Sequence, residues 1–178
     1  MKINLGSGVD YREGWVNVDN QNIKCDVKHN LTIFPYPFED NCADAIELNS
    51  VLEHIPIPLQ QPIINECFRI LKLGGTLTIR VPHFTSFHAY NDIEHHRGYT
   101  SHSFDGFIRN IEPNSMHEYY DRKKFRSSQA KIIFGKKIQV WNYLIELFVN
   151  INQFTRDIYE QSFLSANPAE GVHVELTK

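Results

Sequence analysis

A glycine turn and an acidic residue near the N-terminus have the types and the spacing to hold a nucleoside. The Gly-Ser-Gly turn at residues 6–8 follows a short apolar run, residues 3–5, as when a strand meets a tight turn. Asp19 ends a second apolar run, residues 15–18, and the carboxyl ends of neighbouring parallel strands lie side by side. Glycine lets a ligand approach the backbone, and a carboxylate accepts the hydroxyl hydrogens of a ribose. The alternative is that Asp19 is an ordinary turn aspartate.

A dinucleotide fits this spacing less well than a nucleoside without phosphates. The dinucleotide fingerprint needs a third glycine that opens a helix, with the acid about 20 residues further on. Here Tyr11 stands at the third glycine position, and Asp19 follows Gly8 by only eleven residues. Residues 6–15 have room for about one helical turn, so there is no helix N-terminus to hold a pyrophosphate. S-adenosylmethionine is a nucleoside ligand of the kind that the spacing favours.

A histidine-rich segment supplies the second group of candidate residues. Five of the nine histidines lie between positions 83 and 102, namely His83, His88, His95, His96 and His102. The segment follows an expected strand that ends at Pro82, which places it on the ligand side of an open α/β sheet. Histidine has a reference pKa of about 6.5 and suits proton transfer. We therefore expect an acceptor pocket here, with His83, His95 and His96 as the catalytic candidates.

Two other interpretations of the histidine segment stay open. The histidines can be packed or solvated loop residues, or they can bind a metal. A metal site would draw its ligands from His83, His88, His95 or His96 with Asp92 or Glu94. Their spacing matches no helical i, i+4 pair, so we assign no metal ligands. His54, just after another expected strand, is interpreted as a structural hydrogen-bonding residue.

Strands and helices that alternate along the chain would position these residues. The expected strands are residues 3–5, 15–18, 23–27, 43–48, 76–81, 130–134 and 172–176. One helix should begin near Pro58 and end at Gly74-Gly75, and two more should span residues 100–111 and 141–149. This alternation favours an α/β sandwich around a mostly parallel sheet.

Several segments, in order and with consistent spacing, resemble the class I methyltransferases that use S-adenosylmethionine. They are residues 4–8, 14–19, 34–41, 43–46, 51–55 and 66–77, and together they cover roughly residues 2–82. The resemblance implies a Rossmann-like three-layer sandwich, with a mostly parallel seven-stranded sheet and an antiparallel C-terminal strand. It implies one domain, residues 1–178. Within it lie a cofactor-binding half (1–82), an acceptor-side loop and helix (83–125), and a C-terminal strand-helix-strand unit (126–178).

The resemblance also implies a cofactor site. Its expected residues are Leu5, Gly6, Ser7, Gly8, Asp19, Asp26 and Asn49. The glycine turn would line the methionine part, Asp19 would hold the ribose, and Asp26 or Leu31 would border the adenine. Asn49 would face both cofactor and acceptor. The family often has an acid at the position of Asn4 and a glycine at that of Asp10, so the chain departs from the pattern at both places.

The expected function is methyl transfer from S-adenosylmethionine to a small-molecule or sugar acceptor. Two alternatives remain. The chain can be a binding module that keeps the fold and the cofactor without turnover, as the altered glycine motif and the short first crossover would allow. It can also be a metal-dependent enzyme built on the loop from His83 to His102.

Charge and cysteine content narrow the partners and the compartment. The net charge is -3 and no basic stripe stands out, which argues against a nucleic-acid acceptor. The basic cluster Arg122, Lys123, Lys124 and Arg126 is interpreted as the polar start of a strand. Three widely spaced cysteines favour a reducing compartment, and no apolar run approaches the ~20 residues of a membrane span. We expect a cytoplasmic protein without a membrane partner.

The short first crossover predicts one more property. Residues 6–15 cannot form a full helix, so one face of the sheet should be thinly covered. Either the helix at residues 141–149 or a second subunit would then cover it. Since exposed apolar sheet surface favours association, we expect a homodimer.

Overall fold

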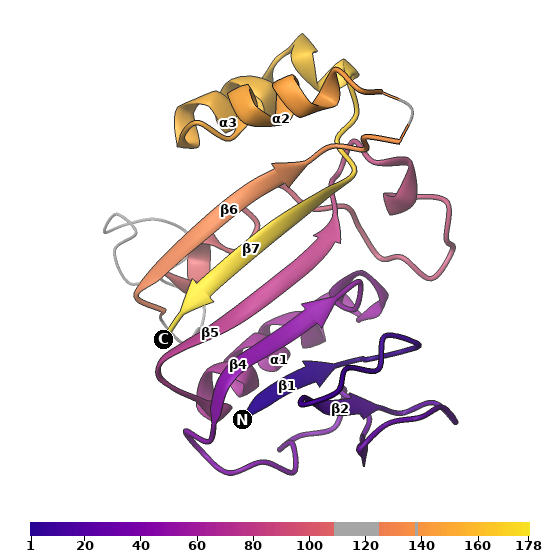
Figure 1. Cartoon of the computed structure of the whole chain (residues 1–178), viewed down its shortest axis with the longest axis vertical. Helices are drawn as coiled ribbons and strands as arrows, with labels where there is room; N and C mark the ends of the chain where they lie inside the picture. The colour runs from indigo at the N-terminus through magenta and orange to yellow at the C-terminus, as the bar shows by residue number, and fades with distance from the viewer. Residues whose placement is uncertain (109–124, 138) are drawn as a thin grey trace.

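The computed structural model describes residues 1–108, 125–137 and 139–178, and its centre is one seven-stranded sheet (Figure 1). The strands are β1 (Lys2–Leu5), β2 (Val16–Asp19), β3 (Val27–Lys28), β4 (Ala43–Asn49), β5 (Leu71–Pro82), β6 (Ser127–Ile133) and β7 (Gly171–Thr177). Their order is β3-β2-β1-β4-β5-β7-β6, and β7 runs antiparallel to both of its neighbours. The mostly parallel sheet with an antiparallel C-terminal strand is confirmed.

The two faces of the sheet differ in chemistry because side chains alternate along each strand. One row of paired residues across four strands is fully apolar: Leu5, Leu48, Ile79 and Val174. These side chains are at most 1% exposed. The neighbouring row is polar: Asn4, Glu47, Thr78 and Glu175. The sheet therefore has one face that must be covered and one that can face water.

Helix α1 (Ile57–Ile70) covers part of the apolar face. Its buried apolar residues recur every three or four positions, as a single helical face requires: Ile63, Ile64, Cys67 and Ile70. Gln60 is also buried, and its Nε2 donates to the carbonyl oxygens of Leu52 and Ile55. These two bonds attach the start of α1 to the short helix η1 (Leu52–His54), which carries two residues of the site below.

The polar face carries loops in place of a second helical layer among the described residues. No helix forms between β1 and β2, as the short spacing predicts. Arg12 from this connection lies over the face, pairs with Glu47 at 2.8 Å and stacks on Trp15. Arg80 pairs with the other oxygen of Glu47 at 2.9 Å. The expectation that the uncovered face is apolar is wrong, because its strand positions are polar.

Helices α2 (Asn142–Val149) and α3 (Gln153–Gln161) lie together beyond one end of β6 and β7 (Figure 1). A separate small core joins them to the sheet, and its buried members are Ile132, Phe134, Val149, Tyr159 and Ala169. Helix α2 therefore does not cover the open face. In the part of the chain that the structure describes, no helix is long and apolar enough to cross a membrane.

Two expected helix boundaries are wrong. Helix α1 ends at Ile70, and Leu71 is already extended and pairs with Ala43. Gly74, with φ 79°, therefore lies within β5, where the pairing register with β4 shifts, and does not end the helix. The expected helix at residues 100–111 is reduced to one turn, η3 (Asp105–Phe107), and its last three residues lie outside the described chain. Three of the four residues of the basic cluster, 122–124, also lie outside it.

Candidate functional site

The turn after β1 is built so that only glycine fits its first position. Gly6 and Gly8 have φ angles of 67° and 50°, in the left-handed region. The backbone N–H groups of Gly6 and Ser7 both donate to the carbonyl oxygen of Val18, at 2.8 and 3.0 Å, which joins the turn to β2. A Cβ on Gly6 would lie 2.6 Å from Cγ2 of Val51, whereas a Cβ on Gly8 would meet nothing within 4 Å. The turn is thus closed on the Val51 side and open at Gly8.

Asp19 lies where the sequence predicts, beside this turn. Its Oδ2 accepts from the backbone N–H of Gly8 at 2.8 Å, and its Oδ1 accepts from that of Gln21 at 2.9 Å. The residue is only 7% exposed. A carboxylate has about four acceptor positions, so each oxygen keeps one for a ligand. The two N–H bonds fix the carboxylate in place before any ligand arrives.

Ser7 adds an unsatisfied hydroxyl to the turn. The residue is 4% exposed, and its Oγ is buried with no hydrogen-bond partner among the described residues. A buried hydroxyl without a partner costs about 1–3 kcal/mol, so such groups are rare and indicate a missing partner such as a water molecule or a ligand. The orphaned hydroxyl, the glycine required at position 6 and the fixed carboxylate of Asp19 fit a nucleoside cofactor.

One departure from the family pattern, Asn4, has a structural reason. Asn4 is 1% exposed, and its Nδ2 donates to the carbonyl oxygen of Asp10 at 2.8 Å and to Oδ1 of Asn17 at 3.3 Å. A carboxylate at this position could make neither bond, because it has no hydrogen to donate. The Asn4 amide therefore closes the short connection that replaces a helix.

The other expected cofactor residues have different surroundings. The Asp26 carboxylate accepts from the backbone N–H of Asn17 at 2.8 Å and from the hydroxyl of Tyr11 at 2.9 Å. The Asn17 backbone bond is the main cause of its lowered pKa. Asp26 thus stabilises the turn before β3, and its contact with adenine stays a prediction. Leu31 is buried in the main core, and Asn49 lines the cavity described next.

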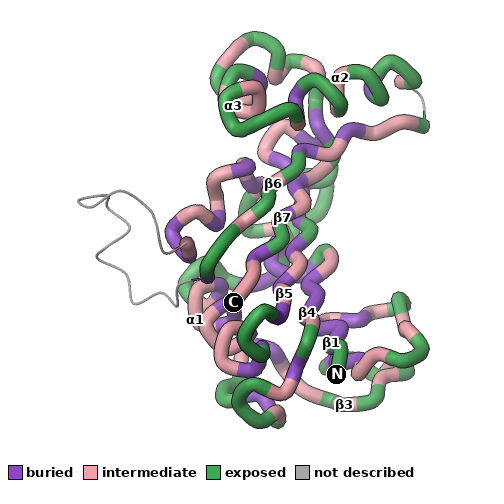
Figure 2. Tube along the Cα trace, turned by 60° about the vertical axis from the view of Figure 1, so that its left-hand side comes forward, coloured by how far each residue is buried: buried purple, intermediate pink, exposed green. Residues whose placement is uncertain are grey.

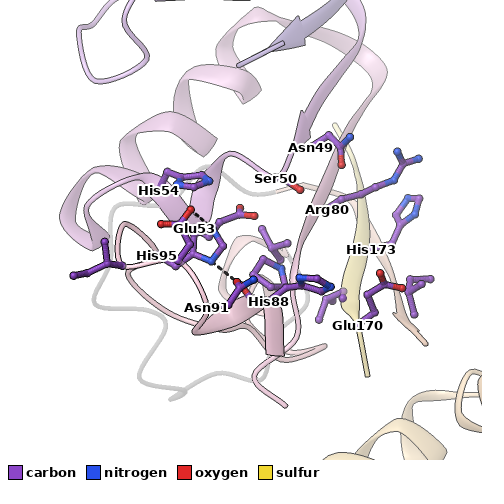
Figure 3. A pocket seen from close by; sticks show the side chains of 17 residues that line it. Asn49, Ser50, Glu53, His54, Arg80, His88, Asn91, His95, Glu170 and His173 are labelled. Atoms are coloured by element: carbon purple, nitrogen blue, oxygen red, sulfur yellow. Dashed lines mark hydrogen bonds and ion pairs between the residues drawn. The ribbon is translucent and has the colours of Figure 1, made fainter. Parts of the chain in front are cut away.

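A cavity of about 940 Å³ opens at the carboxyl ends of β4 and β5 (Figure 3). Its lining combines apolar surface with polar side chains, which include Asn49, Glu53, Arg80, His95, Glu170 and His173. Ser50, also in the lining, has a φ of 55°, a strained value of the sort found at functional sites. Val51, the next residue, is the one that packs against Gly6. The cavity and the glycine turn are therefore neighbours through residues 49–51.

Three side chains of the lining converge at one side of the cavity: Glu53, His54 and His95 (Figure 3). One potential ligand atom from each lies within 4.8 Å of the others. Glu53 is 2% exposed and its Oε2 has no hydrogen-bond partner among the described residues. Burial raises the pKa of Glu53 to about 7, and burial also lowers the pKa of His54. The rings of His54 and His95 meet edge to face at 4.5 Å.

The three predicted catalytic histidines have unlike environments. His95 lines the cavity. His83 is fully buried, with Nδ1 bonded to Thr85 at 2.7 Å and Nε2 to Glu160 at 3.2 Å, outside the cavity lining. His96 is exposed, and its backbone N–H donates to the carbonyl oxygen of Glu53. The catalytic assignments stay predictions, and the geometry favours His95 among them.

The sequence reasoning missed Glu53, Arg80 and His173 as members of the site. The position of Glu53 could have identified it, because the residue comes shortly after the end of an expected strand, on the ligand side of the sheet. Arg80 and His173 lie inside strands and reach the cavity because β5 and β7 pair, with Arg80 opposite His173. Sequence spacing cannot reveal a pairing between residues so far apart.

Comparison with known proteins agrees with this architecture. Residues 6–79 match a family model described as a methyltransferase domain. A SAM-dependent methyltransferase from Archaeoglobus fulgidus superposes with a TM-score of 0.65 at 14% identity, covering 99% of this chain and 85% of that one. The plantazolicin methyltransferase BpumL, solved in complex with SAH, gives a TM-score of 0.52 at 11% identity, covering 99% and 75%. A search of the curated proteins finds no significant match.

The fold and the matched segment agree with each other. The strand order and the antiparallel β7 are those of the Rossmann-like methyltransferase fold, and the predicted resemblance to the class I methyltransferases is confirmed.

Proposed function

We propose that this chain binds S-adenosylmethionine and transfers its methyl group to a small polar acceptor such as a sugar. The observation that carries the proposal is the turn of residues 6–8, whose orphaned Ser7 hydroxyl lies beside the carboxylate of Asp19. The family match over residues 6–79 and the SAH-bound structural relative support the choice of cofactor.

The chain's own residues would hold the cofactor in a defined way. Asp19 keeps one acceptor position on each oxygen for the two ribose hydroxyls. Ser7 offers its free hydroxyl, and the missing side chain of Gly8 leaves open space for close approach. Asn49, between the turn and the cavity, would face both reactants. When bound, the cofactor supplies an activated methyl group on a sulfonium, so the protein need only align and deprotonate the acceptor.

The cavity suits a small polar acceptor. Its volume of about 940 Å³ is at the upper end of the range usual for small-molecule sites. Arg80, Glu170 and His173 can donate to and accept from hydroxyl groups. Nε2 of His95 would accept the proton that the acceptor loses as its lone pair attacks the methyl carbon. We further propose that the reaction takes place in the cytoplasm, which the three free cysteines support.

Label transfer tests the proposal. The protein is incubated with S-adenosylmethionine labelled in the methyl group and with pools of sugars, glycosides and small polar metabolites. We expect labelled product from one pool, and none with the Gly6→Val variant. Cofactor binding without label in any pool would favour the non-catalytic binding module instead.

A further inference from the structure

We propose that Glu53, His54 and His95 form a binding site for a divalent transition-metal ion, with Zn²⁺ as the best fit, at the wall of the cavity. Two imidazoles and one carboxylate are a common ligand set for such ions. The ligands differ from the set considered from sequence alone, since only His95 is shared. Metal binding itself is independent of methyl transfer, and only its role toward the acceptor rests on the proposed function.

Glu53 provides the first argument. The residue is 2% exposed, and its Oε2 is buried without a hydrogen-bond partner among the described residues. A buried carboxylate is costly unless it is paired with a cation or coordinates a metal. His54 comes from the same short helix and His95 from the loop that faces it, so the cluster is held from two sides (Figure 3).

The hydrogen bond of His95 provides the second argument. Its Nδ1 lies 2.8 Å from the carbonyl oxygen of His88. A carbonyl oxygen only accepts, so Nδ1 must carry the hydrogen and Nε2 of the neutral ring presents a lone pair. Metal-bound histidines are typically oriented in this way, by a backbone carbonyl on the opposite nitrogen. The structure thus fixes His95 in the tautomer that a metal requires.

The surroundings of the lone pair provide the third argument. Nε2 of His95 faces the carboxylate of Asp92 at 4.0 Å. A cation bound at Nε2 would also be stabilised by this nearby carboxylate. The ligand atoms of Glu53, His54 and His95 lie within 4.8 Å of one another. Ligands of one tetrahedral Zn²⁺ lie about 3.3 Å apart, so small side-chain rotations would complete the site.

Three protein ligands leave one coordination position open. Because all three residues line the cavity, this position would face the acceptor. A metal there would bind an acceptor hydroxyl and lower its pKa, which would favour methylation at oxygen. With the metal bound, Nε2 of His95 would be a ligand and no longer the base, and the hydroxyl would release its proton to water.

Direct metal binding tests the site without any methyl-transfer assay. Full-length protein without a histidine tag is stripped with a chelator and titrated with ZnCl₂ by calorimetry. Bound zinc is counted by mass spectrometry, and Co²⁺ absorption reports the coordination number. The variants are Glu53→Gln, His54→Asn and His95→Asn. Glu94→Gln and His96→Asn are matched controls, because they change an exposed carboxylate and an exposed imidazole in the same loop.

We expect one Zn²⁺ per wild-type chain and a tetrahedral Co²⁺ spectrum. Each of the three variants should weaken Zn²⁺ binding at least tenfold, while both controls retain wild-type affinity. Circular dichroism identifies any variant that fails to fold, and the exposed His54 then still provides a test. Sub-stoichiometric zinc, or unchanged affinity in folded His54→Asn and His95→Asn, would overturn the proposal. Neither result depends on whether the protein binds S-adenosylmethionine.

A second observation independently points to an interface on α2. Six large apolar residues of α2 and its flanking turns are each between 60% and 68% exposed: Val140, Tyr143, Leu144, Leu147, Phe148 and Ile151. The only charged residue of α2, Glu146, points inward. Its carboxylate accepts from the backbone N–H of Phe134 and from the side-chain ammonium of Lys136. Figure 2 shows exposed positions along α2 at one end of the molecule. A large exposed apolar surface of this kind marks an interaction site.

We infer that a second copy of the chain covers this apolar surface of α2. Six side chains exposed by about two thirds amount to roughly 600 Å², close to the ~800 Å² that each partner contributes to a stable interface. Around it, residues 136–165 carry three acidic residues, Glu146, Asp157 and Glu160, and three basic ones, Lys136, Lys137 and Arg156. This segment has no basic excess, which disfavours an anionic membrane as the occupant, because such membranes attract basic helices. The dimer predicted from sequence would thus use α2 and not the sheet.

Light scattering across a concentration series tests this interface. We expect a dimer mass for the wild type, a monomer for Leu144→Glu/Leu147→Glu, and a dimer for the control Leu73→Glu, an equally exposed leucine in the β5 turn. A wild-type monomer at high concentration, or flotation with neutral lipid vesicles, would contradict the inference.

Discussion

The two halves of the candidate site lie on the same edge of one sheet and are built in opposite ways. Around the glycine turn, the carboxylate of Asp19 is already held by two backbone N–H groups, and the Asn4 amide nitrogen makes two hydrogen bonds. At the cavity, the buried Glu53 has an oxygen with no partner in the described part of the chain, and the His95 ring faces the carboxylate of Asp92.

This difference separates a half whose carboxylate is held before its ligand binds from a half whose carboxylate is not. The carboxylate of the turn half is preorganised, so binding there loses little free energy to the ordering of that side chain. The cavity half holds a charge that a proton or a cation must balance. Substitutions in the two halves should therefore have different signatures, in cofactor affinity on one side and in metal content on the other.

The largest expected effect concerns Gly6. Gly6→Ala adds a Cβ that would lie 2.6 Å from Val51 on a backbone with φ 67°. We expect a destabilisation of about 2–4 kcal/mol and a loss of S-adenosylmethionine affinity of over about 100-fold. Gly14→Ala is the matched control, since its φ is 78° but its Cβ would meet nothing within 4 Å. Calorimetry and thermal melting measure both effects, and equal affinities for the two variants would contradict the role of Gly6.

Asp19→Asn tests the preorganised carboxylate. Asparagine keeps one acceptor oxygen but loses the charge and the second acceptor, so cofactor affinity should fall about 10- to 100-fold. Asp26→Asn should mainly lower stability, because Asp26 binds Asn17 and Tyr11. If Asp26→Asn weakens binding as much as Asp19→Asn, the contact with adenine predicted from sequence is correct and our interpretation of Asp26 is wrong.

Ser7→Ala should separate stability from binding. Removing a buried hydroxyl without a partner should leave the free energy of unfolding of the free protein unchanged or raise it by about 1 kcal/mol. The same change should weaken cofactor binding about fivefold, because the hydroxyl would gain its partner in the complex. A loss of stability without the cofactor would show that Ser7 already has a partner.

The smallest effect lies outside both halves, at His102. Its two ring nitrogens contact Asp105 and Asp157, each at 2.6 Å. Burial alone would lower the pKa of His102, but the bonds to Asp157 and Asp105 outweigh burial and raise it. The stabilisation is thus complete below about pH 6.5 and is lost as the pH rises through the raised pKa. Since the side chain is 40% exposed, we expect only about 0.5 kcal/mol. Denaturant unfolding between pH 5 and 9 should show it in the wild type and not in His102→Gln.

Local sequence signals predicted the sheet better than they predicted the site. Strands such as the one expected at residues 43–48 follow from apolar alternation next to turn residues. The absence of a helix between the first two strands follows from the shortness of the connection, residues 6–15. Helix α3 was missed because its residues are mostly polar, although Asn152 and Thr155 form a capping box at its start. The cavity depends on the pairing of β5 with β7, which brings His173 beside Arg80. Such long-range pairing leaves no trace in local spacing.

The most direct measurement is a calorimetric titration of the full chain with S-adenosylmethionine and, separately, with S-adenosylhomocysteine. We predict micromolar binding of both ligands by the wild type and by Gly14→Ala, with Gly6→Ala binding neither. No binding to the wild type at millimolar concentration would show that the turn of residues 6–8 holds no cofactor, and the proposed function would be wrong.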